Sequence, residues 1–252
     1  MKKRLAVIFG ALLVLAFAAG TAFSMSYEDI FKKSGEYFNG KIDRETFIAL
    51  CTSVADDAGN DSKTRAYALA ARGRAFLDAG DIKKGISDAE VSISTDGTIP
   101  GGYQTMAIAY VKDGKFTEAA DFFQKSADIS SSEEYKKQSM QSANFFRVLG
   151  SASPAATLHK EISDNPFAAE EKYAGKMVGI RGPASKIGRT MSGLPQITME
   201  VEPFKEIECE LSKEAAPALA KLKKGDDVLL VCNLKKAGNS IITFGGCYLW
   251  GK

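Results

Sequence analysis

"ARGRAFLDAGD" at residues 71–81 and "AIAYVKDGK" at residues 107–115 are two versions of one pattern. Each stretch carries apolar residues at helical spacing and ends in a turn marked by glycine, at Gly80 and Gly114. These two glycines stand 34 positions apart. The same spacing separates the pairs Gly73/Ala107, Ala75/Ala109 and Phe76/Tyr110. A repeat of this kind predicts stacked helix–turn–helix units in the first half of the chain.

A 34-residue period of helix pairs resembles the tetratricopeptide repeat family. The first unit runs from Ala66 to about Asp96 and the second from Pro100 to about Ser130. The matching positions are Leu69, Gly73, Phe76, Gly80, Asp81 and Ile86, then Tyr103, Ala107, Tyr110, Gly114, Ala119 and Phe123. The sequence departs from the family at Gly85, where the family favours Ala, and at Gly97, where it favours Pro.

The resemblance implies a concave surface, lined by the first helix of each pair, that binds a protein partner. The outward positions of those helices are the candidate groove residues Tyr67, Arg74, Asp78, Gln104 and Lys112. An ordinary solvated helix face is the alternative interpretation of the same residues.

Two units are too few to bury a solenoid core, so flanking helices are expected. Ser26 and Asp29 form a capping pattern before an amphipathic stretch, and residues 43–57 supply a second helix. A further helix at residues 134–150, with Phe145 and Phe146 on its buried side, closes the stack. We expect six to seven helices in this all-α solenoid.

The N-terminus has the layout of a secretory signal peptide. Basic "MKKR" precedes a run of 16 apolar and small residues, shorter than the ~20 needed to span a bilayer. Ala22 and Ser24 then suit cleavage before Met25. We therefore expect a periplasmic or secreted protein with no stable membrane span after cleavage; a retained anchor is the alternative.

Removing that leader changes the charge balance. The whole chain has 33 Lys and Arg against 31 Asp and Glu. Loss of Lys2, Lys3 and Arg4 brings the mature chain close to neutral, whereas nucleic-acid-binding domains usually have a basic excess.

The apolar period changes from helical to alternating after the Gly/Ser/Ala/Pro-rich stretch at residues 150–157. The expected organisation is therefore a two-domain chain. It comprises a signal peptide at 1–24, helical repeats at 25–149, a linker and helix at 150–165, and a β domain at 166–252. Three strands, one helix and two strands, in that order, predict a small five-stranded OB-fold barrel with accompanying helices.

The stretch from about Ala156 to Trp250 resembles the OB-fold family called tRNA-anticodon-domain-like. The matching residues are Asn165, Ala169, Tyr173, Gly175, Lys176, Gly179, Gly182, Cys209, Leu222, Gly225 and Cys247. The family name records a likeness of fold, so the resemblance does not imply tRNA binding.

Alternation along the second and third strands predicts an acidic outer surface. Thr198, Glu200 and Glu202 are expected to point outward, and so are Glu206, Glu208 and Glu210. OB-folds bind nucleic acid on this face through aromatic and basic side chains. Nucleic acid is therefore an improbable partner, although Arg181, Lys186 and Arg189 stand near the first loop.

No constellation of catalytic residues stands out. His159 is the one histidine, which excludes a His-based triad and multi-His metal sites. The Walker phosphate-loop spacing is absent. We therefore expect no cofactor, no metal and no enzyme activity, but an interaction protein with an unidentified protein partner in the cell envelope. Nucleic-acid or polyanion binding through the barrel is the alternative, and an envelope enzyme with an unrecognised site is the third possibility.

Cysteine pairing is expected in an exported chain. Cys51 stands alone on an apolar helix face and is expected to be a buried core residue. In the barrel the fifth strand lies between the third and fourth, so Cys247 is within reach of either Cys209 or Cys232. The family resemblance includes Cys209 and Cys247, which favours that pair.

Overall fold

The computed structural model describes residues 25–251, so the expected signal peptide lies outside the described residues. Contacts divide the chain into two compact units. The first comprises residues 25–109 with Asp128–Ser132; the second comprises Tyr110–Ala127 with residues 133–251. Within the described residues, no helix is both long enough and apolar enough to cross a bilayer. The domain boundary near residue 150 stays a prediction.

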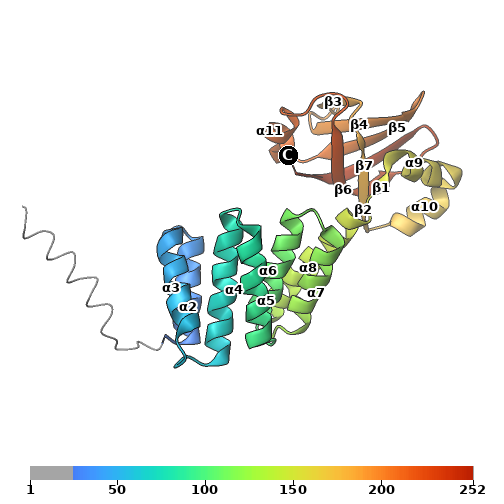
Figure 1. Ribbon diagram of the computed structural model, residues 1–252. Helices are drawn as coiled ribbons and strands as arrows, with labels where there is room; N and C mark the ends of the chain where they lie inside the picture. Colours follow the sequence, from blue (N-terminus) through green and yellow to red (C-terminus); the bar gives the residue numbers. More distant parts are fainter. Residues whose placement is uncertain (1–24, 252) are drawn as a thin grey trace, which may run out of the picture. The chain divides into compact units, whose positions relative to one another are not determined.

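Antiparallel helices make up the first unit, as expected (Figure 1). They are α2 (Tyr27–Phe38), α3 (Arg44–Asp56), α4 (Ser62–Asp78), α5 (Ile82–Thr95) and the greater part of α6 (Pro100–Lys112). Gly80, in the turn between α4 and α5, has φ +83°, a conformation that favours glycine. The first of the two similar stretches therefore belongs to a helix pair, α4 and α5.

A side-chain oxygen caps the first turn of each of the helices α2 to α5. Each cap accepts a hydrogen bond from the backbone N–H three residues ahead, at 2.6–3.2 Å. The capping residues are Ser26, Asp43, Asp61 and Asp81. The predicted reciprocal capping pair of Ser26 and Asp29 is confirmed.

Small residues let α4 and α5 approach closely. A Cβ added to Gly73 would lie 3.0 Å from the carbonyl oxygen of Gly85. A Cβ added to Gly85 would lie 2.3 Å from Cδ2 of Leu77, which is fully buried. The large Leu77 side chain therefore leaves no room for a Cβ at position 85, which explains the glycine there.

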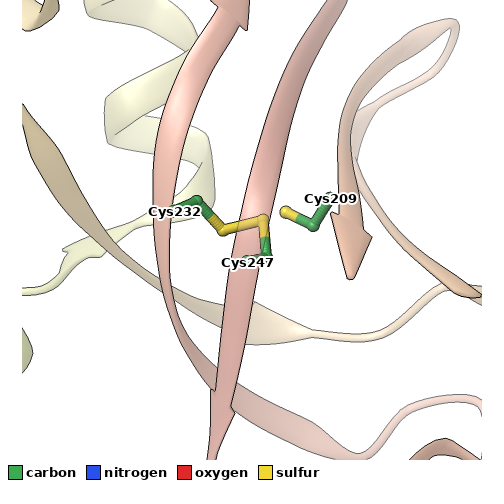
Figure 2. A group of neighbouring side chains, drawn as sticks. All are labelled: Cys209, Cys232 and Cys247. Atoms are coloured by element: carbon green, nitrogen blue, oxygen red, sulfur yellow. A yellow bond between two sulfur atoms is a disulfide. The ribbon is translucent and has the colours of Figure 1, made fainter. Parts of the chain in front are cut away.

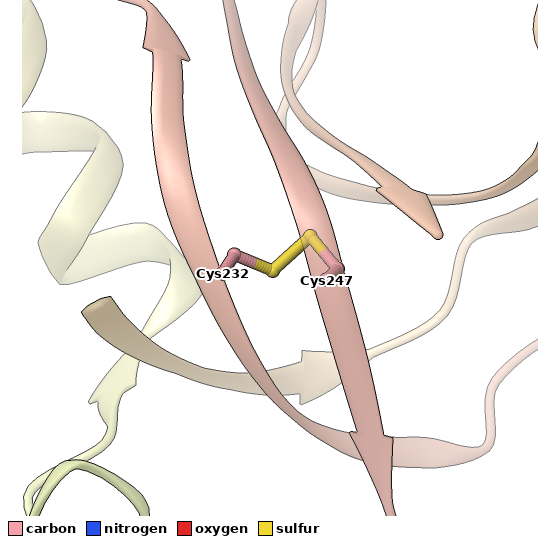
Figure 3. Close-up of a disulfide and its surroundings, with 2 residues drawn as sticks. All are labelled: Cys232 and Cys247. Atoms are coloured by element: carbon pink, nitrogen blue, oxygen red, sulfur yellow. A yellow bond between two sulfur atoms is a disulfide. The ribbon is translucent and has the colours of Figure 1, made fainter. Parts of the chain in front are cut away.

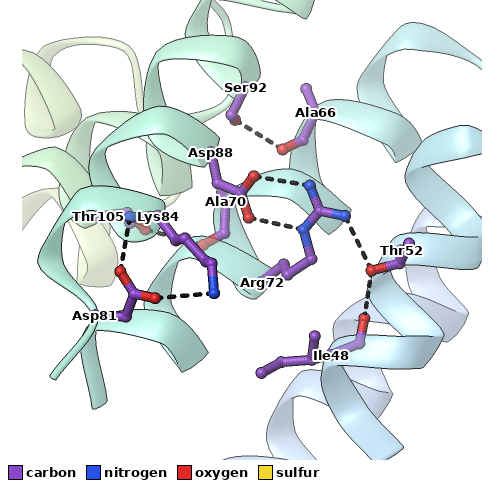
Figure 4. Close-up of polar contacts among 10 residues, drawn as sticks. All are labelled: Ile48, Thr52, Ala66, Ala70, Arg72, Asp81, Lys84, Asp88, Ser92 and Thr105. Carbon is purple, nitrogen blue, oxygen red and sulfur yellow. Dashed lines mark hydrogen bonds and ion pairs between the residues drawn. The ribbon is translucent and has the colours of Figure 1, made fainter. Parts of the chain in front are cut away.

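Arg72 of α4 joins three helices of this unit (Figure 4). Its Nε and Nη2 donate to the two carboxylate oxygens of Asp88 on α5, both at 2.7 Å. Its Nη1 donates to Oγ1 of Thr52 on α3 at 2.9 Å, and that hydroxyl donates to the carbonyl of Ile48. The network is half-buried to buried, and it holds α3, α4 and α5 in one register.

The second unit combines helices with a sheet. Its helices are α7 (Phe116–Asp128), α8 (Glu133–Gly150), α9 (Ala155–Asp164), α10 (Pro166–Tyr173), the short η1 (Lys213–Ala215) and α11 (Ala216–Leu219). Asn165 caps α10 by accepting a hydrogen bond from the N–H of Ala168, and Pro166 stands at the first helical position. The helix expected between the third and fourth strands is present as the short η1 and α11.

The sheet has seven strands in the order β1-β2-β6-β7-β5-β4-β3. The β1/β2 and β5/β7 pairs are parallel and the others are antiparallel. The strands are β1 (Ser153–Pro154), β2 (Met177–Pro183), β3 (Lys186–Arg189), β4 (Pro195–Glu202), β5 (Lys205–Leu211), β6 (Asp227–Lys236) and β7 (Ile241–Trp250). The position of β7 between β5 and β6 confirms the predicted place of the fifth strand.

The expected closed five-stranded barrel is wrong, because this sheet is open. The first predicted strand is interrupted at Ala184 and Ser185 and becomes β2 and β3. The N–H of Ala184 donates to the carbonyl of Asp226, and the N–H of Ser185 donates to that of Thr198. After this break β2 pairs with β6 whereas β3 pairs with β4 at the far edge.

The core of the second unit lies between the sheet and α9. Alternation places Ile197 and Met199 of β4 inside, together with Ile207, Cys209 and Leu211 of β5, as expected. Leu158 and Ile162 of α9 pack into this core, as do Ala169 of α10 and Leu219 of α11. Thr198 was expected to point outward but is buried, and its carbonyl accepts hydrogen bonds from Ser185.

Candidate functional site

The candidate groove residues divide between the two units. Tyr67, Arg74 and Asp78 lie on α4 and Gln104 on α6 in the first unit, whereas Lys112 belongs to the second. Arg74 Nε donates to Oδ1 of Asp78 at 3.2 Å, an i,i+4 pair on one helix face. The structure therefore brings Arg74 and Asp78 together, and each remains a candidate binding residue.

Aromatic rings of α2 meet α4 beside these residues. The ring of Tyr67 lies 5.0 Å from that of Tyr27 in a T-shaped contact and 5.8 Å from that of Phe31. The guanidinium of Arg74 lies 5.4 Å from the centroid of the Phe38 ring. We call these five residues the aromatic face.

Much of the aromatic face is open to solvent. Phe31 is 59% exposed and Phe38 is 52% exposed. Tyr27 is partly buried, and burial, with the neighbouring Glu28 charge second, raises the pKa of its phenol. Lys63 Nζ lies 4.3 Å from the centroid of the Tyr27 ring, so cations flank the rings at both ends.

Three of these aromatic residues were missed in the sequence. Tyr27, Phe31 and Phe38 stand at i, i+4 and i+11 of α2, a spacing that places them on one side of a helix. The helical spacing of these aromatic residues was visible in the sequence. The 34-residue repeat does not include α2, however, so the sequence did not show whether this side of the helix is exposed or buried.

The acidic surface of β4 and β5 is present. Glu200 lies directly opposite Glu206 across the two strands, and Glu208 lies opposite Thr198. Lysines neutralise part of the charge: Lys205 Nζ lies 2.7 Å from Glu202, and Lys235 pairs with Glu210. Carboxylates on this face would repel a phosphate backbone.

Three cysteines meet inside the sheet (Figure 2). Cys209 of β5, Cys232 of β6 and Cys247 of β7 are all buried, and their Sγ atoms all lie within 4.8 Å of one another. A disulfide joins Cys232 to Cys247 (Figure 3), and Cys209 is a free thiol. The Cys232–Cys247 pairing was the alternative; the expected Cys209–Cys247 bond is wrong.

Strand register explains the pairing. In the parallel β5/β7 pair, a register shift sets Cys247 opposite Leu211, while Cys209 lies opposite Phe244. In the antiparallel β6/β7 pair, a bulge between Val231 and Asn233 brings Cys232 beside Cys247. A cross-link over this sequence separation of 15 contributes about 3 kcal/mol in the chain-entropy model.

The fourth cysteine belongs to the first unit. Cys51 on α3 is fully buried, as expected, and burial raises the pKa of its thiol to about 12. It lies in the core with Phe47 and Val54. Its thiol is free and buried, without the neighbouring sulfurs that surround Cys209.

The structure combines helices with an open mixed sheet. The family that the sequence matches is called tRNA_anti-like. The model of that family matches residues 103–244, more than half of the sequence, and the chain belongs to it. The match begins in α6, well before the stretch from about Ala156 that carried the resemblance. It therefore spans α7 and α8 as well as the sheet as far as the first residues of β7.

No curated protein matches the chain. Among solved structures, one match is a crystal structure described as a "putative nucleic acid-binding lipoprotein" from Klebsiella pneumoniae subsp. pneumoniae MGH 78578. The two are 20% identical, with a TM-score of 0.35, over 41% of this chain and 95% of that one.

Proposed function

We propose that this chain is a non-catalytic interaction protein of the cell envelope. Its helix pairs act as tetratricopeptide-type repeats that bind a segment of a protein partner, and the sheet adds a second binding surface. One observation carries the proposal: Phe31 and Phe38 are more than half exposed on the same side of α2. Clustered exposed apolar side chains commonly mark interaction sites.

The chemistry of the aromatic face suits a protein segment. Tyr, Phe and Arg are enriched in protein interfaces, and Tyr and Arg are common binding hot spots. Apolar side chains of the partner would lie on Phe31 and Phe38. Lys63 and Arg74 flank the rings and would attract a carboxylate of the same segment.

The acidic surface of β4 and β5 supports a protein rather than a nucleic acid. Binding of single-stranded oligonucleotides would show a steep dependence on salt, because bound cations are released from the phosphates. We expect no such binding. A steep slope would favour the nucleic-acid alternative instead.

The test is capture of the partner by crosslinking in intact cells, followed by titration of the partner identified. Replacing both rings, Phe31→Ser with Phe38→Ser, should weaken binding at least ~10-fold, as expected when hot spots are lost. Phe167→Ser is the matched control, since Phe167 is 85% exposed on α10 in the second unit. Equal affinity of both variants, with unchanged melting temperatures, would reject the aromatic face as the binding site.

A further inference from the structure

Three sulfur atoms on adjacent strands form a compact group in the core of the second unit (Figure 2). Their Sγ atoms lie within 4.8 Å of one another, and their residues are at most 6% exposed. Metal–thiolate bonds are about 2.3 Å long, so three sulfurs around one ion lie roughly 4 Å apart. Once the Cys232–Cys247 bond is reduced and its two sulfurs move apart to about this distance, the three cysteines can surround a single ion.

We propose that the reduced form of this group, Cys209, Cys232 and Cys247, binds one Cu⁺ ion with three sulfur ligands. In the structure two of the sulfurs are joined, so the oxidised chain offers one free thiol. A dithiol reductant opens the site: it gives two electrons and two protons to the Cys232–Cys247 bond and becomes a disulfide itself. Cu⁺ then displaces thiol protons as Cu–S bonds form.

Ligand type and number favour this ion. Thiolates are soft ligands and select Cu⁺, Zn²⁺ and iron–sulfur centres. Structural zinc almost always has four ligands. Among residues 25–251, no histidine or carboxylate completes the sulfur group. The buried position also restricts access of a water molecule as a fourth ligand, which leaves a three-coordinate soft cation as the best fit.

The Cys209 thiol is fully buried among apolar side chains. Desolvation, with the neighbouring Glu208 charge second, raises the pKa of the Cys209 thiol well above its usual range. A protonated thiol is compatible with the surrounding apolar side chains, such as Ile207 and Phe244. A bound cation supplies the charge that deprotonates coordinating thiols.

The experiment uses the full chain in oxidised form and after anaerobic reduction with dithiothreitol and its removal. Each form is titrated with Cu⁺ against the chelator bicinchoninate, and the number of bound ions is read by native mass spectrometry. We expect one ion in the reduced chain and none in the oxidised chain. Zn²⁺ should bind more weakly than Cu⁺.

Two variants make the test specific. Cys209→Ala keeps the disulfide pair but removes the third ligand, and its affinity should fall by at least ~10-fold, the loss typical even of indirect damage to a metal site. Cys51→Ala removes the other buried thiol and should leave binding unchanged. Bound Cu⁺ should also slow the alkylation of Cys209, Cys232 and Cys247 relative to the reduced chain without Cu⁺, a comparison that needs no variant.

Several outcomes would overturn the proposal: no ion in the reduced chain, unchanged affinity in Cys209→Ala, or equally fast alkylation of the three thiols with and without Cu⁺. Tighter binding of Zn²⁺ than of Cu⁺ would overturn the three-coordinate assignment. The proposal is independent of partner binding by the aromatic face, and neither result decides the other.

Discussion

The charged side chain of Arg72 lies in a largely buried position between helices, where an unpaired charge is unfavourable. Its side chain is 17% exposed and that of Asp88 is 10% exposed, so each ion depends on the other for compensation (Figure 4). Breaking a buried pair costs more than the pair contributes, because the remaining charge stays desolvated. Thr52 adds a further hydrogen bond to the same guanidinium.

We expect Arg72→Met to lower the free energy of unfolding by about 3–5 kcal/mol, since Asp88 is left buried without a counter-ion. Urea denaturation followed by circular dichroism measures the change. Arg74→Met is the matched control: Arg74 pairs with Asp78 at a more exposed site, so its loss should cost at most about 1 kcal/mol. The double variant Arg72→Met with Asp88→Leu should recover much of the loss. Equal effects of the two single variants would contradict this account.

Single residues differ in how far the sequence could predict them. Gly73 could be predicted to lie at a close helix contact, because its place in the repeat requires a small side chain. The disulfide could not be assigned in the same way. Its pairing depends on a bulge in β6/β7 and a register shift in β5/β7, and alternation alone does not predict either irregularity.

Three helices of the first unit, α3, α4 and α5, begin at aspartates whose carboxylates titrate. The carboxylates of Asp43, Asp61 and Asp81 accept backbone N–H bonds, chiefly from the residue three ahead, and these bonds lower their pKa values. Such caps stabilise the folded state fully above the unfolded pKa of about 3.9. The contribution is lost as the pH falls below that value and through the folded pKa.

We therefore expect the first unit to lose stability between pH 6 and pH 3. The triple change Asp43→Asn, Asp61→Asn and Asp81→Asn should reduce this loss, because Asn caps helices about as well as Asp but does not titrate. Thermal unfolding at the two pH values measures the difference. Asp→Asn changes at Asp121 and Asp164, which are not N-cap residues, should leave the loss as it is in the unaltered chain. The prediction fails if the cap variant and this control lose stability equally.

The elements themselves were largely predictable. Periodicity and caps predicted the helices of residues 27–56 and the order of strands and helix after residue 175. The Ser153–Pro154 pair is typical of a helix start, with proline at the first helical position, yet both residues pair with β2 as a short strand. Backbone pairing with a distant strand outweighed a local helix-start signal there.

At the scale of the second unit, aromatic side chains connect α7 and α8 to the end of the sheet. Trp250 of β7 makes T-shaped contacts with Phe116 and Phe146, with ring centroids 5.4 Å apart in each case. Phe146 also stacks on Phe123 at 5.4 Å. The sequence predicted that Phe146 would be buried against other helices. It gave no sign of Trp250, since a contact between distant segments depends on how the sheet and the helices pack.

This cluster provides a built-in probe, because Trp250 is the one tryptophan of the chain. Phe146→Ala removes the ring that contacts both Trp250 and Phe123, and we expect a loss of about 3 kcal/mol of stability, as for other large-to-small changes in packed sites. It should also expose the indole to water and shift its fluorescence emission to longer wavelength.

Phe122→Ala is the matched control, since Phe122 stacks on Tyr110 and not on Trp250. Emission should stay unchanged in that variant, because the helices would still cover the indole. An unshifted emission in Phe146→Ala would mean that α8 does not shield Trp250 in solution, and that the helices and the sheet of this unit are not packed as one body.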